Sequence, residues 1–216
     1  MTTPPREDFL DRHFERLGLR ERKKLKTRRS IQDHALRLFT AQGYDATTVE
    51  QIAEAAEISP STFFRYFPTK EDVVVTDDYD PMMAEVFRAQ PPGLSPIDAT
   101  RRMFREVLGH AYATDKEQLT ARIRLTLSVP ALRARSFDAS LHDTYKIFTG
   151  LLAERVGGSP GDFEIQVFAQ AVIGVLQAVV IRWAEGGGVE DLPELVDRGL
   201  EFLASGCPLT DPERRP

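Results

Sequence analysis

Apolar residues recur at the spacing of an α-helix along nearly the whole chain of 216 residues. The clearest stripe, at positions i, i+4, i+7 and i+8, consists of Ile31, Ala35, Leu38 and Phe39. No stretch of the sequence shows the alternating pattern of a half-buried strand, and none carries a hairpin signal. The pattern therefore predicts an all-α protein.

Capping residues, glycines and prolines divide this pattern into separate helices. We expect helices at 20–42, from about Thr48, between Ser59 and Pro68, from Thr69 to the loop at 91–96, and at 97–114, 116–128, 130–156, 162–185 and 192–205. Thr47–Glu50 and Thr48–Gln51 both fit a capping box for the second helix. Pro60 stands in the first turn of the third helix, where its missing N–H costs nothing.

The segment 47–70 stands out because it holds two short helices joined by a tight turn. The second of them is about two turns long, and its outer side carries Ser61, Thr62, Arg65 and Tyr66. A helix that short buries little surface, but it fits into a groove of DNA, as in helix-turn-helix proteins. The alternative is a surface helical hairpin with a core of Phe63, Phe64 and Phe67. We favour that interpretation for the phenylalanines but not for the polar face.

Charge is distributed unevenly along the chain. The net charge of −5 by itself argues against nucleic-acid binding. Residues 1–70, however, hold 13 Lys and Arg against 10 Asp and Glu, and the run 20–29, RERKKLKTRR, has seven basic residues and one acidic residue. This asymmetry favours a DNA-facing end on an acidic body, with an ordinary solvated helix start as the alternative.

Each exposed polar residue of the two short helices and their flanks suits a particular part of DNA. Arg65 can donate two hydrogen bonds to O6 and N7 of guanine. The hydroxyls of Thr62 and Tyr66 suit phosphate oxygens, and Lys70 can reach the backbone as a flexible point charge. Thr48, with the first N–H groups of its helix, can bind another phosphate.

The stretch GYDATTVEQIAEAAEISPSTFFRYFPTKEDVV resembles the DNA-binding signature of TetR-family transcriptional regulators, and the similarity covers about Thr27–Val74. The resemblance implies an all-α homodimer, in which each subunit has a three-helix DNA-binding domain and a larger helical domain for a small effector. It implies by default a repressor that a small-molecule effector releases from a palindromic operator. The residues that it places on DNA are Arg28, Thr48, Ser61, Thr62, Arg65, Tyr66 and Lys70.

Three residues depart from the usual pattern of that family. Glu57 stands at a turn position that is frequently glycine, which predicts a slightly strained turn. Phe64 stands where tyrosine is common, so one hydroxyl contact is lost. Glu50 stands where some members read a base, and here we expect it to cap its helix. These departures leave the operator sequence open.

The change in texture after Asp80–Pro81 and the resemblance together divide the chain into parts. We expect a flexible N-terminal extension at 1–19, the helix-turn-helix domain at 20–68, an effector-binding and dimerisation domain at 69–207, and a disordered tail at 208–216.

The expected helix at 162–185 has no charged residue from Ile165 to Ile181. It is slightly short for a membrane span, and three glutamines interrupt it. An apolar helix in a soluble protein must be covered on several sides, and a second copy of the chain is the natural cover for one of them. We therefore expect a homodimer through the helices at 162–185 and 192–205. The alternative is the central helix of a monomeric bundle.

The large domain is expected to hold an effector pocket among its long helices. The candidate lining residues, each of which could instead be ordinary core, are Phe104, Leu108, Tyr112, Leu127, Phe148, Phe168 and Val172. A group of arginines could hold a phosphate-bearing ligand or could pair with surface acids; they are Arg101, Arg102, Arg105, Arg122, Arg124, Arg133 and Arg135. With the basic run and FFRYFPTKEDVV, the sequence PALRAR resembles a TetR subgroup associated with acyl-CoA-like ligands.

Enzyme and cofactor chemistry finds no support in the sequence. Residues 157–161, GGSPG, lack the lysine and the spacing of a phosphate-binding loop, and no ligand frame surrounds Asp77, Asp78 and Asp80. We expect no catalytic residue, no cofactor, no metal and no membrane partner. The single cysteine, Cys207, suits a reducing cytoplasm. The rival classes are a helical interaction module without DNA affinity and a small helical enzyme.

Overall fold

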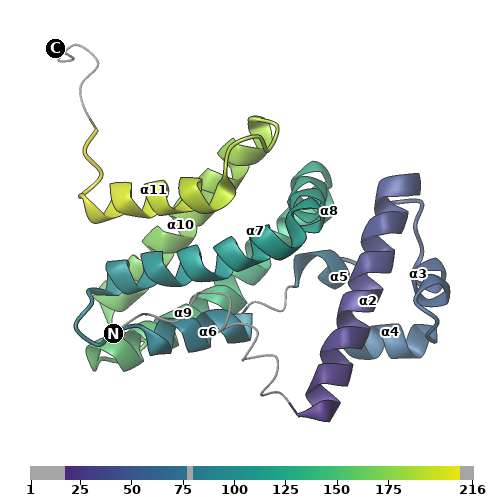
Figure 1. The fold of residues 1–216 in the computed structure, drawn as a ribbon, viewed down its shortest axis with the longest axis horizontal. Coiled ribbons are helices and arrows are strands. Elements are labelled where there is room, and N and C mark those ends of the chain that lie inside the picture. The colour runs from purple at the N-terminus through teal and green to yellow at the C-terminus, as the bar shows by residue number, and fades with distance from the viewer. Residues whose placement is uncertain (1–17, 77–79, 210–216) are drawn as a thin grey trace. The chain divides into compact units, whose positions relative to one another are not determined.

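The computed structural model describes residues 18–76 and 80–209, and every regular element in these ranges is helical (Figure 1). The all-α fold expected from the apolar pattern is confirmed. The chain forms two compact units, the first of residues 1–82 and 110–141 and the second of residues 83–109 and 142–216.

The helices of the two units alternate along the chain. The first unit contains α2 (Leu19–Gln42), α3 (Val49–Ala55), α4 (Pro60–Tyr66), α5 (Asp72–Val75), the later part of α7 (Pro96–Ser128) and α8 (Pro130–Ala139). The second unit contains most of α6 (Asp80–Ala89), the earlier part of α7, α9 (Tyr145–Val156), α10 (Phe163–Glu185) and α11 (Leu192–Ala204).

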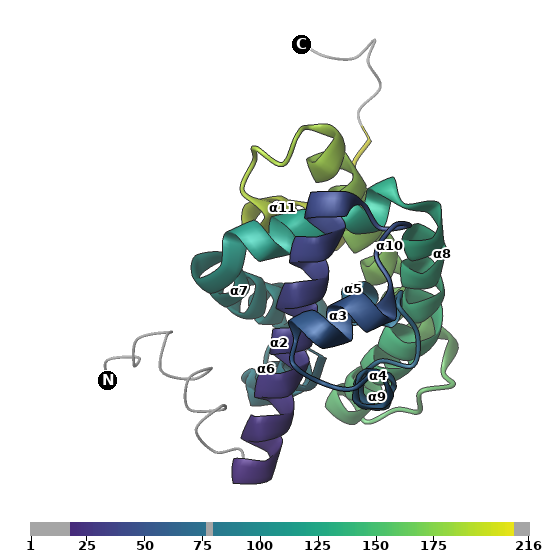
Figure 2. The same cartoon turned by 90° about the vertical axis from the view of Figure 1, so that its right-hand side faces the viewer.

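Helices α2, α3 and α4, which we call the head, pack around one apolar core (Figure 2). Its most buried members, each at most 3% exposed, are Ile31, Ala35, Phe39, Ile52, Phe63 and Phe67. The stripe predicted on α2 is therefore the face that it buries. Phe64, by contrast, is 50% exposed, so its expected place in the core is wrong. Since Phe63 and Phe67 are four residues apart and share the buried side, position 64 is turned about 100° away from it.

Side chains fix the start of both short helices. The N–H of Thr48 donates to Gln51 Oε1 (2.9 Å) and the N–H of Gln51 donates to Thr48 Oγ1 (3.2 Å), which is the expected capping box of α3. The competing box through Thr47 does not form, because Thr47 is buried and donates to a carbonyl of the preceding turn (2.7 Å). Ser59 caps α4 as expected, by accepting from the N–H of Thr62 (3.1 Å).

Glu57 closes α3 in the left-handed region of the backbone, with a φ of 55°. Its N–H donates to the carbonyl of Glu54 (3.0 Å), and the N–H of Ile58 donates to that of Ala53 (2.9 Å). These are the two bonds of a Schellman motif, whose left-handed position is usually glycine. The strained turn expected from Glu57 is thus confirmed.

The expected fourth helix is not continuous. Helix α5 ends at Val75, Thr76 after it is extended with a ψ of 130°, and α6 begins a few residues later. Gln32 Nε2 donates to the carbonyls of Val73 (3.3 Å) and Thr76 (2.7 Å), and so satisfies acceptors at the end of α5. Pro81 lacks the N–H of a continuing helix and is favoured in a first turn. The prediction of one helix running on from Thr69 is therefore wrong.

Two further boundaries differ from the predicted ones. Helix α7 is a single helix of 33 residues, so the expected division into 97–114 and 116–128 is wrong, and no glycine or proline stands at that break. The expected helix at 130–156 is divided into α8 and α9 by a π-helical turn, Ser140–Thr144. A π-turn adds one residue to the hydrogen-bonded ring and so shifts the register between the two helices.

Helix α8 completes the core of the head. Leu132 is fully buried in the same cluster as Ile31. Arg135 Nε donates to Asp72 Oδ1 (2.9 Å), and Asp72 is 5% exposed. Asp72 also exchanges hydrogen bonds with Thr69, at 3.1 and 3.2 Å, which fixes the start of α5. A segment far along the chain is therefore part of the head's packing.

The second unit is built on α10, which packs against α9 and α11. Gly199 lets α11 approach α10 closely, since a Cβ there would lie 2.8 Å from a methyl group of Val175. Arg101 on α7 donates twice to Asp197 on α11 (2.9 and 3.2 Å), and Arg105 adds a third bond (2.9 Å). Burial acts to raise the pKa of Asp197, but the bonds from these arginines outweigh it and lower the pKa below its usual value.

Helix α10 keeps an exposed side of mainly apolar and small residues, namely Phe163, Val167, Gly174, Ala178 and Ile181, with the polar Gln170 among them. The three large ones are 47–73% exposed. By length and composition α10 could cross a membrane, and 22% of its most apolar stretch is buried. Its contacts with α9 and α11 are those of a helix in a bundle, with one side left uncovered by the protomer.

Replacing Glu57 with glycine should stabilise the protein, because glycine adopts positive φ without the cost of about 1–2 kcal/mol that other residues carry. The greater freedom of glycine in the unfolded chain offsets part of this gain. We expect a net rise of about 0.5–1 kcal/mol in the free energy of unfolding, measured by denaturant titration. Ala55→Gly, at the last residue of α3, is the matched control and should be destabilising by up to about 1 kcal/mol. A less stable Glu57→Gly protein would contradict the strained turn.

Candidate nucleic-acid interface

The outer side of α4 presents hydroxyls at its start and a cation near its end. Ser59 Oγ lies 2.9 Å from Ser61 Oγ and 3.0 Å from Thr62 Oγ1, so the three hydroxyls form one cluster. Ser61 and Arg65 are exposed and lie one helical turn apart. The face that the sequence assigned to DNA is thus accessible, while the opposite face of α4 is in the core.

Aromatic rings lie beside both of the arginines that were predicted to contact DNA. Arg65 Cζ lies 5.6 Å from the ring centre of Tyr66, which is half-buried. Arg28 on α2 lies over Phe67, with Cζ 4.7 Å from the ring centre. Side chains held in this way lose less conformational freedom when they bind a ligand.

Lys70 is held in place by the head itself. Its Nζ donates to the carbonyls of Tyr44 (2.9 Å) and Thr47 (3.1 Å), and it lies 4.1 Å from the ring centre of Tyr44. An ammonium group has three N–H donors, so one is left for a phosphate. The charge that the sequence predicted to be flexible is a fixed one, and its contact with DNA stays a prediction.

A phenol–carboxylate pair lies beside Lys70. Tyr44 Oη donates to Glu71 Oε1 (2.6 Å). Burial, and next this hydrogen bond, raise the pKa of Tyr44 well above its usual value. The same bond is the largest cause that lowers the pKa of Glu71, and the charge of Lys70 adds to the effect. Glu71 is therefore a carboxylate at neutral pH.

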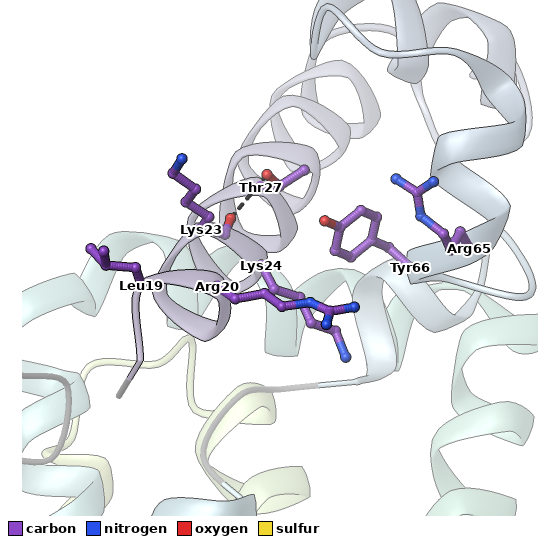
Figure 3. A pocket seen from close by; sticks show the side chains of 7 residues that line it. All are labelled: Leu19, Arg20, Lys23, Lys24, Thr27, Arg65 and Tyr66. Atoms are coloured by element: carbon purple, nitrogen blue, oxygen red, sulfur yellow. Dashed lines mark hydrogen bonds between the residues drawn. The ribbon is translucent and has the colours of Figure 1, made fainter. Parts of the chain in front are cut away.

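A basic groove of about 800 Å³ lies between the first turns of α2 and the end of α4 (Figure 3). Its lining residues are Leu19, Arg20, Lys23, Lys24, Thr27, Arg65 and Tyr66. Four of these are cations, and none is acidic. In Figure 3, Tyr66 extends from α4 toward α2, and Arg20 extends from α2 toward α4.

The predicted contacts include only Arg28 from the basic run 20–29, so most of this groove was missed. Arg20, Lys23, Lys24 and Thr27 stand at i, i+3, i+4 and i+7, a spacing that places side chains on one helix face. That signal is present in the sequence. Arg65 and Tyr66 of the opposite wall were predicted as DNA contacts, but that they face α2 depends on how α2 and α4 cross. Thr48 is exposed at the start of α3 and does not line the groove.

The residues predicted to line an effector pocket divide between the two units. Phe148 and Val172 are 7% and 1% exposed, and the Phe148 ring packs against Phe87 and Phe168, with centroids 5.9 and 6.4 Å away. Burial of Phe148 and Val172 agrees with the ordinary-core alternative. The half-buried members are Phe104, Leu108 and Phe168 in the second unit and Tyr112 and Leu127 in the first.

Several arginines considered for a phosphate-bearing ligand already have carboxylate partners. Arg101 and Arg105 bind Asp197, and Arg135 binds Asp72 and Asp138. For these three the pairing with acids, the alternative left open by the sequence, is confirmed. Two others, Arg102 and Arg133, are exposed.

Comparison with known proteins gives two family matches that follow one another along the chain. Residues 31–75 match the family described as bacterial regulatory proteins, tetR family. Residues 94–208, more than half of the chain, match the family described as MftR C-terminal domain. The first match contains the helix-turn-helix, and the second contains α7 to α11.

Individual relatives cover most of the chain. The HTH-type transcriptional regulator TcmR of Streptomyces glaucescens is 36% identical over 75% of this chain and 73% of its own length. The fatty acid metabolism regulator protein of Bacillus subtilis is 23% identical over 82% of this chain and 93% of its own. A similar solved structure is Thermus thermophilus FadR, a TetR-family transcriptional repressor in complex with lauroyl-CoA. It has a TM-score of 0.54 and 27% identity, and the match covers 88% of this chain and 98% of FadR.

Proposed function

We propose, from the premise that this chain belongs to the TetR family of bacterial transcriptional regulators, that it is a cytoplasmic homodimeric repressor released from its operator by an acyl-CoA-like effector. As a member of that family it is a DNA-binding transcriptional regulator, with an N-terminal helix-turn-helix and a C-terminal helical domain. Its named relatives are regulators. The observation that carries the proposal is the exposed polar side of α4 on a head that is otherwise closely packed.

In this function α4 enters the major groove, as the second helix of a helix-turn-helix does. Arg65 reads guanine through O6 and N7, because its planar guanidinium matches both acceptors. The hydroxyls of Ser61, Thr62 and Tyr66 and the charge of Lys70 bind phosphates and fix the position of α4, without reading sequence themselves. Two observations support this division between base reading and phosphate binding: Arg65 is exposed, and Lys70 is held by two carbonyls of the head.

The dimer forms through the uncovered side of α10, together with α11. An apolar face of this kind on a soluble protein marks an interaction surface. Gly174 and Ala178 are exposed in the middle of that side and allow a second helix to approach closely. Two heads related by a two-fold axis then meet half-sites about 34–36 Å apart, one turn of DNA.

The effector is an acyl-CoA or a molecule of the same chemistry. The lauroyl-CoA complex of the FadR relative supports this class. Tyr112 supplies a second support, since its hydroxyl is buried and has no hydrogen-bond partner among the described residues. A buried hydroxyl without a partner costs about 1–3 kcal/mol, and a polar group of the effector would remove that cost. Release requires that the effector bind more tightly to the state that does not fit the operator.

Arg65→Ala should relax the base preference at one position of each half-site, since a bidentate contact contributes about 1–3 kcal/mol of discrimination. Duplexes enriched from a random library by the wild-type protein provide the operator, and competition by single-base variants measures the preference. Arg37→Ala, an exposed arginine of α2 outside the predicted contacts, is the matched control. If the wild type enriches no duplex, DNA reading is wrong. If Arg65→Ala keeps full preference, only the role of Arg65 is wrong.

Gly174→Arg should convert the dimer into a folded monomer. A Cβ at Gly174 has no neighbour within 4 Å in the protomer, so the arginine disturbs only what covers α10. Sedimentation velocity measures the mass, and circular dichroism checks the fold. Ala113→Arg, on an exposed position of α7, is the control and should stay dimeric. A dimeric Gly174→Arg protein would exclude this interface.

Lauroyl-CoA should lower the affinity of the wild-type protein for the selected duplex, as measured by fluorescence anisotropy, whereas CoA without an acyl chain should not. Tyr112→Phe should bind the duplex normally but require about 2- to 10-fold more lauroyl-CoA for release, the effect of one lost hydrogen bond. Unchanged DNA affinity at saturating lauroyl-CoA would overturn the effector class and leave the DNA-binding function standing.

A further inference from the structure

We infer that the basic groove between α2 and α4 binds the sugar–phosphate backbone of DNA, next to the base pairs that α4 reads. The inference rests on the proposed DNA-binding function and extends it to residues of the first turns of α2. The groove would hold one strand of the duplex on α2 while the recognition helix occupies the major groove. It adds Arg20, Lys23 and Lys24 to the surface that binds DNA.

The charge of the groove is the first ground for this assignment. Arg20, Lys23, Lys24 and Arg65 face one space, and none of the described side chains that line it is acidic. Within the described ranges, none of these four cations forms an ion pair with an acidic side chain, whereas Arg88, Arg101, Arg105 and Arg135 all do. Cations gathered without counter-charges repel one another, and a polyanion relieves that repulsion.

The position of the groove is the second ground. Its wall on α4 is made by Arg65 and Tyr66, which also belong to the polar side of the recognition helix (Figure 3). A strand lying in the groove is therefore continuous with the DNA that α4 contacts. The hydroxyl of Tyr66 faces the α2 wall in Figure 3 and can donate to a phosphate there.

The length of the cationic row fits a backbone better than a single small anion. Arg20 and Lys24 are four positions apart on the helix, which is a rise of about 6 Å. Successive phosphates of one strand are about 3.4 Å apart along the DNA axis. The row therefore spans about two phosphates. Lys23 and Lys24 are flexible point charges on exposed positions, which suits phosphate contacts that carry no sequence information.

The test compares Lys23→Ala/Lys24→Ala with the wild type on the duplex selected by the wild-type protein. Each phosphate contact contributes about 0.9 to the slope of log affinity against log salt concentration. We expect the double variant to lower that slope by about 2 for each head that binds, while its preference among single-base variants of the duplex stays unchanged. Lys26→Ala, an exposed lysine of α2 outside the groove, is the matched control and should change the slope less.

Neutral methylphosphonate linkages locate the contact. Placed one at a time along the duplex, they should weaken the wild type at about two neighbouring positions beside each half-site and leave the double variant unaffected there. The groove assignment is wrong if the double variant has the wild-type salt slope or the same methylphosphonate pattern as the wild type. The proposed function still stands in that case, provided that the wild type binds DNA selectively. A wild type that selects no duplex overturns both.

Discussion

The placement of α3 and α4 depends on one apolar core, and Leu132 of α8 is buried in it. Helices α3 and α4 have seven residues each, and isolated helices shorter than about 12–15 residues are marginal in water. They are therefore held by packing. Helix α8 supplies part of that packing, and the Arg135–Asp72 bond fixes α8 beside α5. Since α7 begins in the second unit and leads into α8, the second unit is connected along the chain to the core that holds α4.

The same packing gives α4 a buried side and an exposed side. Phe63 and Phe67 are fully buried, which leaves the opposite side of the helix with Ser61 and Arg65 to face outward. An acidic protein can bind DNA because its cations are concentrated at one end of the chain, in the run 20–29 and on α4. In the proposed function, bases are read by a few fixed side chains, and affinity comes from a larger number of phosphate contacts that salt weakens.

The sequence predicts best what depends on neighbours in the chain. The capping box at Thr48, the cap at Ser59 and the left-handed Glu57 involve partners within a few residues, and all three were predicted and are present. What depends on distant partners could not be predicted. Lys70 is fixed by carbonyls 23 and 26 residues away, and Arg101 binds a carboxylate 96 residues away. The α2 wall of the basic groove could be predicted, because it follows from helical spacing. The position of the α4 wall opposite it could not, because it depends on the crossing of two helices.

Reading of base edges in the major groove by α4 is tested most directly by dimethyl sulfate interference on the selected duplex. The reagent methylates guanine N7, which faces the major groove, and adenine N3, which faces the minor groove. We predict that methylated guanines block binding in two clusters about 10–10.5 base pairs apart, and that the block at these guanines disappears in Arg65→Ala. Interference confined to adenine N3 would place the contacts in the minor groove and contradict α4 as the reading helix.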